Sequence, residues 1–169
     1  MSTICDVGKI LVPMIWAAMN ISSWINPRFH LVLPTETRLS DLMGLLNISF
    51  CPGLLAVLKA SSPPTIDWFL SLDTYVPKNV WAVYAVVLAK PKHKSILYIG
   101  SATAAQRGAR GRLENYDAQT HLPRYIAKAL RDGYTIQHKA LLAWCSIPDA
   151  IHIPCCRTVI VGLEAVLAC

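Results

Sequence analysis

Charged residues and long apolar runs are both scarce in this sequence. Only 15% of its 169 residues are charged, and ten of them are Asp or Glu. Hydrophobic residues make up 54%, which excludes a disordered chain, because disordered segments are poor in apolar residues. The longest apolar run, residues 10–19, contains Pro13. A membrane span needs roughly 20 apolar residues, so we expect no membrane-spanning helix.

The sequence also lacks the short motifs of several enzyme classes. It has no P-loop, no GxSxG nucleophile motif and no HExxH zinc motif. Its six cysteines include no CxxC pair, and the adjacent Cys155 and Cys156 are poorly placed to share one zinc ion. We therefore expect a reduced, intracellular setting, in the nucleus or the cytoplasm. Asp6 and the lack of a small-x-small cleavage site argue against a signal peptide.

Charge is distributed unevenly along the chain. Residues 1–76 hold four Lys or Arg and five Asp or Glu, a net charge of −1. Residues 77–169 hold twelve Lys or Arg and five Asp or Glu, a net charge of +7. The second half is therefore the half expected to meet a polyanion, although a solvated basic surface would have the same charge.

The first half predicts helices and carries no recognisable motif. Residues 10–25 predict a buried helix or an irregular segment, and helices are expected at 35–47, 52–60 and 65–72. Thr35 suits the N-cap of the second of these. We expect residues 1–76 to form a mostly helical accessory region whose role the sequence does not indicate.

The second half predicts the order β-β-α-α-β-α. Val and aromatic residues mark strands at 80–90, 95–100 and 134–145. Helices are expected at 111–116, 121–132 and 158–169. The change in character near Pro77 predicts a separate domain over residues 77–169.

Two of the motifs that carry chemistry lie at the start of this second half. The first is Tyr84 on the first expected strand, followed by Tyr98-Ile99-Gly100 at the end of the second. The second is Arg112 with Tyr116, whose i,i+4 spacing places both side chains on one face of a helix.

Two further residues complete the series. His121 opens an expected helix, and Glu164 is a lone acid within an apolar helix. In this order the motifs resemble the signature of the GIY-YIG endonuclease family, and the stretch that begins at Trp81 is similar to fungal members. The resemblance implies an α/β (α+β) fold over residues 77–169, with a three-stranded antiparallel sheet flanked by helices.

The resemblance implies a metal-dependent endonuclease that hydrolyses phosphodiester bonds. Glu164 would be the metal ligand, because a carboxylate suits Mg²⁺ or Mn²⁺ that retains several waters. Arg112 would hold a phosphate oxygen and offset the developing charge. Tyr84 would orient the attacking water or take its proton, and Tyr98 would position the water or the phosphate. The sequence leaves the identity of the general base open.

DNA is the implied partner. Tyr116 and His121 match positions that belong to the family's catalytic set. A glycine allows close approach of a phosphate, and exposed cations bind the DNA backbone, which makes affinity salt-dependent. The residues expected to line this surface are Gly100, Arg107, Arg110, Arg124 and Lys128.

Three positions depart from the family pattern. Ala82 stands where the family usually has the first glycine of its signature. Ser101 stands where some members have a lysine. The asparagine that many members carry after the glutamate helix has no counterpart after Glu164 in this sequence.

The sequence also admits readings without catalysis. Tyr84 and Tyr98 would then be ordinary strand aromatics, His121 a helix cap, and Glu164 the ion-pair partner of Arg157 on the same helix face. At the level of function, one alternative is a catalytically inactive nucleic-acid-binding module on the same fold. Another is an interaction protein that acts through its apolar N-terminal half.

Overall fold

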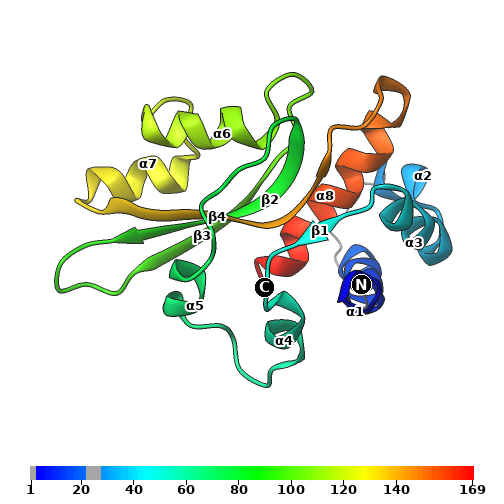
Figure 1. The fold of residues 1–169 in the computed structure, drawn as a ribbon, viewed down its shortest axis with the longest axis horizontal. Helices are drawn as coiled ribbons and strands as arrows, with labels where there is room; N and C mark the ends of the chain where they lie inside the picture. Colours follow the sequence, from blue (N-terminus) through cyan, green and yellow to red (C-terminus); the bar gives the residue numbers. More distant parts are fainter. Residues whose placement is uncertain (1–2, 22–27) are drawn as a thin grey trace.

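The computed structural model of the chain describes residues 3–21 and 28–169, which form a mixed α+β structure (Figure 1). The first helix, α1, covers Thr3–Ile21. Of the two alternatives expected for residues 10–25, a buried helix or an irregular segment, the structure has a helix as far as residue 21, and residues 22–25 lie outside the described part.

An antiparallel sheet forms the centre of the described structure. Its strands are β1 (Ser49–Phe50), β2 (Val80–Ala89), β3 (Ile96–Ala102) and β4 (Thr135–Ser146), in the spatial order β1-β4-β2-β3. All three neighbouring pairs are antiparallel. The three strands predicted from the second half are therefore confirmed, and β2 lies between the other two.

The prediction of a three-stranded sheet was wrong, because the described sheet has four strands. The additional strand, β1, comes from the half of the chain that was expected to be helical. It pairs Ser49 with Trp144 and Phe50 with Ala143 at the outer edge of β4. A strand of two residues shows no alternation of apolar and polar residues, so the sequence carried no signal for it.

Helices cover both faces of the sheet (Figure 1). On one face lie α6 (Gly108–Asp117) and α7 (Arg124–Arg131). On the other face lies α8 (Ile153–Leu167), and α1 packs on its outer side. The shorter helices are α2 (Arg28–Val32), α3 (Glu36–Leu45), α4 (Leu54–Lys59), α5 (Ile66–Leu70) and the 3-10 turn η1 (Ala150–His152).

Helix α3 begins as the sequence predicted. The hydroxyl oxygen of Thr35 accepts a hydrogen bond from the backbone N–H of Arg38 at 3.1 Å. This bond satisfies one of the N–H groups that have no partner within the first turn of a helix.

The two faces of β2 belong to two different hydrophobic cores. The residues that face α1 and α8 are Trp81, Val83, Ala85 and Val87. The residues that face α6 and α7 are Val80, Ala82, Tyr84, Val86 and Leu88. Because both faces are covered, this strand is apolar at almost every position, which is why it could be predicted from the sequence.

The first half of the chain contributes to the core that α8 forms with the sheet. A Cβ atom on Gly162 of α8 would lie 2.8 Å from Cγ2 of Ile15 on α1, so only glycine allows these two helices to pack this closely. Residues of both halves share one core cluster. The domain boundary at residue 77 stays a prediction.

One described segment is long and apolar enough to cross a membrane. It covers Ala150–Leu167, with a mean hydropathy of 1.6, and 33% of it is buried within the protein. It contains no long unbroken apolar run, because residues such as His152, Arg157 and Glu164 interrupt it. Helices of protein cores pass the same test, and this one packs against β2, β3 and α1. The absence of a membrane span stays a prediction.

The contact between Gly162 and Ile15 can be tested by substitution. We expect Gly162→Ala to lower the free energy of unfolding by about 1–3 kcal/mol, because a clash with Ile15 outweighs the higher helix propensity of alanine. Urea unfolding measures the change. Ile15→Leu removes the Cγ2 methyl and should recover part of the loss in the double variant.

Gly8→Ala in α1 is the matched control. A Cβ on Gly8 has no neighbour within 4 Å, so this substitution should stabilise the protein by about 0.5–1 kcal/mol. Stabilisation by both Gly162→Ala and Gly8→Ala would contradict the close packing of α1 on α8.

Candidate active site

A glycine on β3 makes room for two tyrosines. Tyr84 on β2 lies directly opposite Gly100 on β3, so their side-chain positions share one face of the sheet. A Cβ on Gly100 would lie 2.7 Å from Cε1 of Tyr98 and 2.9 Å from the hydroxyl of Tyr84. Gly100 is buried and has a packing role here. The approach of a phosphate to Gly100 stays a prediction.

The hydroxyl of Tyr84 lies at the centre of a hydrogen-bonded cluster. It lies 2.9 Å from the hydroxyl of Tyr116, and Nε of Arg112 donates to it at 3.2 Å. The guanidinium of Arg112 also lies 5.4 Å from the centroid of the Tyr116 ring. The i,i+4 spacing on α6 therefore brings both side chains to Tyr84, as the sequence predicted.

The two tyrosines of the signature, Tyr84 and Tyr98, differ in burial. Tyr84 is 0% exposed and Tyr116 is 1% exposed, whereas Tyr98 is half-buried. In this arrangement Tyr84 holds Arg112 in place, and the groups of the cluster that solvent reaches are Tyr98 and Arg112.

The pKa values in the cluster follow from this burial. Burial raises the pKa of Tyr98, the charges of Tyr84 and Glu164 raise it further, and Arg112 opposes them. Burial also raises the pKa of Tyr116, with its hydrogen bond to Tyr84 as the next cause. Burial alone would lower the pKa of Arg112, but its contact with Tyr84 leaves that pKa raised.

His121 contributes its backbone to the cluster. Its carbonyl oxygen accepts a hydrogen bond from Nη1 of Arg112 at 2.8 Å, and its φ of 50° is left-handed. The prediction that His121 opens a helix was wrong, because α7 begins at Arg124 with Pro123 as its N-cap. A positive φ does not fit a helical turn, and proline disfavours helical geometry in the residue before it. The imidazole of His121 is exposed.

Glu164 reaches the site from the other face of the sheet. It is half-buried on α8, and its Oε2 accepts a hydrogen bond from the hydroxyl of Ser101 on β3. Ser101 lies opposite Val83, on the α8 side of the edge strand β3, and Glu164 is one of the charges that raise the pKa of Tyr98 on this strand. From the sequence, Ser101 was noted only because some family members have a lysine at this position, and its contact with Glu164 was not predicted.

The ion pair between Arg157 and Glu164 is not formed. Nη2 of Arg157 donates to the carbonyl oxygen of Thr103 at 3.2 Å, and its guanidinium lies 5.7 Å from the Trp81 ring centroid. Glu164 therefore keeps its second carboxylate oxygen, Oε1, without a partner in the described part of the chain.

Glu164 is a single carboxylate and not part of a ligand cluster. Within residues 3–21 and 28–169, no three His, Cys, Asp or Glu side chains lie together in a metal-binding group. A single carboxylate fits Mg²⁺ or Mn²⁺, because such ions keep several waters and take further oxygens from substrate phosphates. Glu164 Oε1, half-buried and unpaired among the described residues, fits the role of that carboxylate.

Two cysteines fill space in the core. Among those whose side chains the structure describes, Cys51 and Cys145 are buried and free of disulfides. Burial raises the pKa of Cys51 to about 11 and that of Cys145 to about 12. Both thiols are therefore protonated at neutral pH and fill space in the core.

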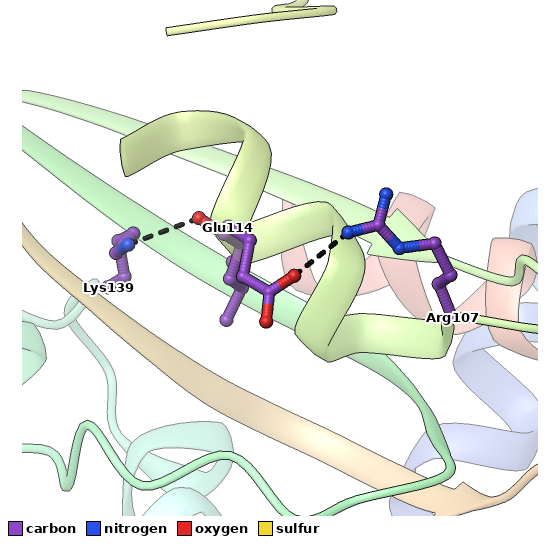
Figure 2. A network of polar contacts seen from close by, with 4 residues as sticks. Arg107, Glu114 and Lys139 are labelled. Carbon is purple, nitrogen blue, oxygen red and sulfur yellow. Dashed lines mark hydrogen bonds and ion pairs between the residues drawn. The ribbon is translucent and has the colours of Figure 1, made fainter. Parts of the chain in front are cut away.

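The cations expected to bind DNA lie at the start of α6 and on α7. Arg107 is the N-cap residue of α6, and Arg110, two residues before Arg112, does not share the helix face of Arg112. Arg107 forms an ion pair with Glu114 at 3.0 Å (Figure 2). Arg124 and Lys128 are exposed one turn apart on α7.

A groove lies beside α6 that no sequence pattern predicted. Its volume is about 840 Å³, and Arg110 and Tyr75 lie among its lining residues. Lys139 of β4 spans it, donating to the carbonyl oxygen of Leu113 at 3.2 Å (Figure 2) and forming an ion pair with Asp117. The lining comes from three distant stretches of chain, so no local pattern announces it.

Tyr125 on α7 is another feature of this region that the sequence did not predict. Tyr125 is 55% exposed, and its ring stacks on that of Tyr98, with the ring centroids 6.5 Å apart and the planes 23° apart. A tyrosine between the cations Arg124 and Lys128 was the available signal, because nucleic-acid-binding surfaces interleave aromatic and basic residues.

The buried hydroxyl pair predicts how stability depends on pH. The folded-state pKa of Tyr116 lies above its unfolded value of about 10. The buried, protonated hydroxyl of Tyr116 therefore makes its full contribution to the free energy of unfolding below pH ~10. This contribution is lost as the pH rises further, because the unfolded chain releases a proton that the folded protein keeps. Tyr116→Phe should flatten this loss and, at neutral pH, cost about 1 kcal/mol for the bond to Tyr84.

Urea unfolding at several pH values between about 7 and 11 measures both effects. Tyr75→Phe, at a tyrosine that is 70% exposed, is the matched control and should leave the profile unchanged. An unchanged alkaline slope in Tyr116→Phe would contradict the burial of this hydroxyl.

No family model, curated protein or solved structure matches this chain. The relationship to the GIY-YIG family stays a prediction, and it rests on the residues Tyr84, Tyr98, Arg112 and Glu164 together with the geometry described above.

Proposed function

We propose that the protein is a divalent-metal-dependent endonuclease that hydrolyses DNA phosphodiester bonds. The observation that carries the proposal is that residues far apart in the sequence, which together resemble the family signature, come together in the fold. Tyr84, Tyr98 and Arg112 come from β2, β3 and α6 and meet around one hydroxyl group, and Glu164 acts electrostatically on the same place.

Arg112 is the group that would hold the scissile phosphate. Its Nε and Nη1 are held by Tyr84 and by the carbonyl of His121, while Nη2 has no partner among the described residues. A guanidinium that is already held at two points loses little side-chain conformational entropy when it binds a phosphate oxygen. Its charge then offsets the negative charge that develops in the transition state.

Tyr98 would contact the phosphate or the attacking water as a hydrogen-bond donor. Its raised pKa keeps the phenol protonated at neutral pH, which suits donation and not proton abstraction. Tyr84 and Tyr116 would not contact the substrate, because both are buried; they hold Arg112 in position.

A cation held between Glu164 and a DNA phosphate would supply positive charge at that phosphate and make a bound water more acidic. Ser101 orients Glu164 by donating to Oε2, which leaves Oε1 directed to other partners. Ser101 is thus a positioning residue for the metal ligand.

Plasmid nicking with the purified full chain tests the proposal. Supercoiled DNA should be nicked in Mg²⁺ or Mn²⁺ and left intact in EDTA. Glu164→Gln should lower the nicking rate by 100-fold or more, on the order of the loss seen when one charge-stabilising group is removed. Asp132→Asn, the same chemical change at an exposed acid, should leave the rate unchanged.

Persistence of nicking in Glu164→Gln would exclude Glu164 as the metal ligand. Equal losses in Glu164→Gln and Asp132→Asn would point to a general effect of charge and would also count against the proposed site.

Arg112→Lys tests the phosphate contact separately. Lysine keeps the charge but lacks the planar fork, so it cannot contact Tyr84, His121 and a phosphate together. We expect the nicking rate to fall by roughly 100- to 1000-fold. Arg131→Lys, at the exposed end of α7, is the matched control, and an unchanged rate in Arg112→Lys would contradict the role given to the fork.

The second candidate function is a nucleic-acid-binding module without catalysis. The complete burial of Tyr84 favours it, because this tyrosine cannot touch water in the described arrangement. Salt-dependent DNA binding without nicking in any of the metals would support this candidate over the endonuclease.

A further inference from the structure

Tyr125 offers an aromatic surface to solvent beside the candidate active site. It lies in the first turn of α7 and is 55% exposed. Its ring stacks on that of Tyr98, with 6.5 Å between the centroids, and the Tyr98 ring centroid in turn lies 6.5 Å from that of Tyr84. The exposed ring of Tyr125 thus packs against the ring of Tyr98, which would contact the phosphate.

Two unpaired cations flank this ring. Arg124 precedes Tyr125, and Lys128 lies three residues after it, on a neighbouring part of the helix surface. Both side chains are exposed, and neither forms an ion pair or a side-chain hydrogen bond within the described part of the chain. Both charges are therefore available to an anionic ligand.

This combination matches the chemistry of an unpaired nucleotide. Proteins that bind single strands stack successive bases on aromatic side chains and hold the backbone phosphates with cations. Bases within a duplex are already stacked on one another, so they do not present a face to Tyr125. The ring therefore distinguishes single-stranded nucleotides from an intact duplex.

We propose that Tyr125 is a stacking platform for an unpaired nucleobase, with Arg124 and Lys128 on the flanking phosphates. The protein accordingly prefers DNA that carries single-stranded nucleotides next to the scissile bond, such as a flap, a gap or a bulge, over a continuous duplex. This inference rests on the proposed function in that its ligand is DNA.

Binding measurements test the platform without relying on catalysis. The probes are a fluorescently labelled dT12 strand and a labelled blunt hairpin duplex, titrated with the full chain in EDTA while anisotropy is recorded. Tyr125→Ala should weaken binding of dT12 by roughly 5- to 100-fold, the range for loss of one base-stacking contact. Binding of the duplex should change less than about twofold, since no base stacks on the ring there.

Two variants serve as controls. Tyr125→Phe keeps the ring and should retain the affinity for dT12. Tyr75→Ala removes a tyrosine that is 70% exposed and lines the groove beside α6, and it should leave both affinities unchanged. Lys128→Ala should lower the slope of log affinity against log salt by about 0.7 for dT12, the value expected for one phosphate contact.

Three results would overturn the inference: unchanged dT12 binding in Tyr125→Ala, equal losses for dT12 and the duplex, or a loss in Tyr125→Phe as large as in Tyr125→Ala. Its failure is distinguishable from failure of the endonuclease. Nicking that depends on Glu164, with no effect of Tyr125 on dT12 binding, would overturn the platform alone. Binding of dT12 that depends on Tyr125, without any nicking, would support the platform and overturn the endonuclease.

Discussion

The hydroxyl of Tyr84 is the group on which the site depends. It is buried, and a buried hydroxyl without partners costs several kcal/mol, on the order of 2–7. Its two partners, Tyr116 and Arg112, both come from α6, so satisfying this one group fixes where α6 lies on the sheet. Gly100 completes the arrangement, because any side chain on it would occupy the place of the Tyr84 ring. The position of Arg112 is thus a consequence of packing and does not require a substrate.

The sheet itself depends on burial of β2 from both sides. One side meets α6 and α7, and the other meets α8, against which α1 packs through Gly162. This places the tyrosine cluster and Glu164 on different faces of the sheet. Both contact the edge strand β3, the cluster through Gly100 and Glu164 through Ser101. The location of the candidate site at this edge therefore follows from the strand order.

The strands and the residue types of the site could be predicted from the sequence, but their roles could not. β2, β3 and β4 have seven to twelve residues each and are rich in Val, Ile, Leu and aromatic residues, whereas β1 has two residues and pairs with the end of β4. The i,i+4 pair of Arg112 and Tyr116 follows from helix geometry alone. The left-handed backbone of His121 and the hydroxyl bond of Ser101 depend on tertiary contacts, and no local pattern reports them.

Burial also decides what the tyrosines can do in the proposed reaction. A phenol with a raised pKa is a poorer proton acceptor at neutral pH than a free one, and Tyr98 and Tyr116 both have raised pKa values. Tyr84 is shielded from water and already shares its hydroxyl with two partners. The tyrosines of the cluster are therefore suited to donating hydrogen bonds and positioning Arg112. This arrangement is therefore suited to stabilising charge at the phosphate, and not to proton abstraction by a phenol.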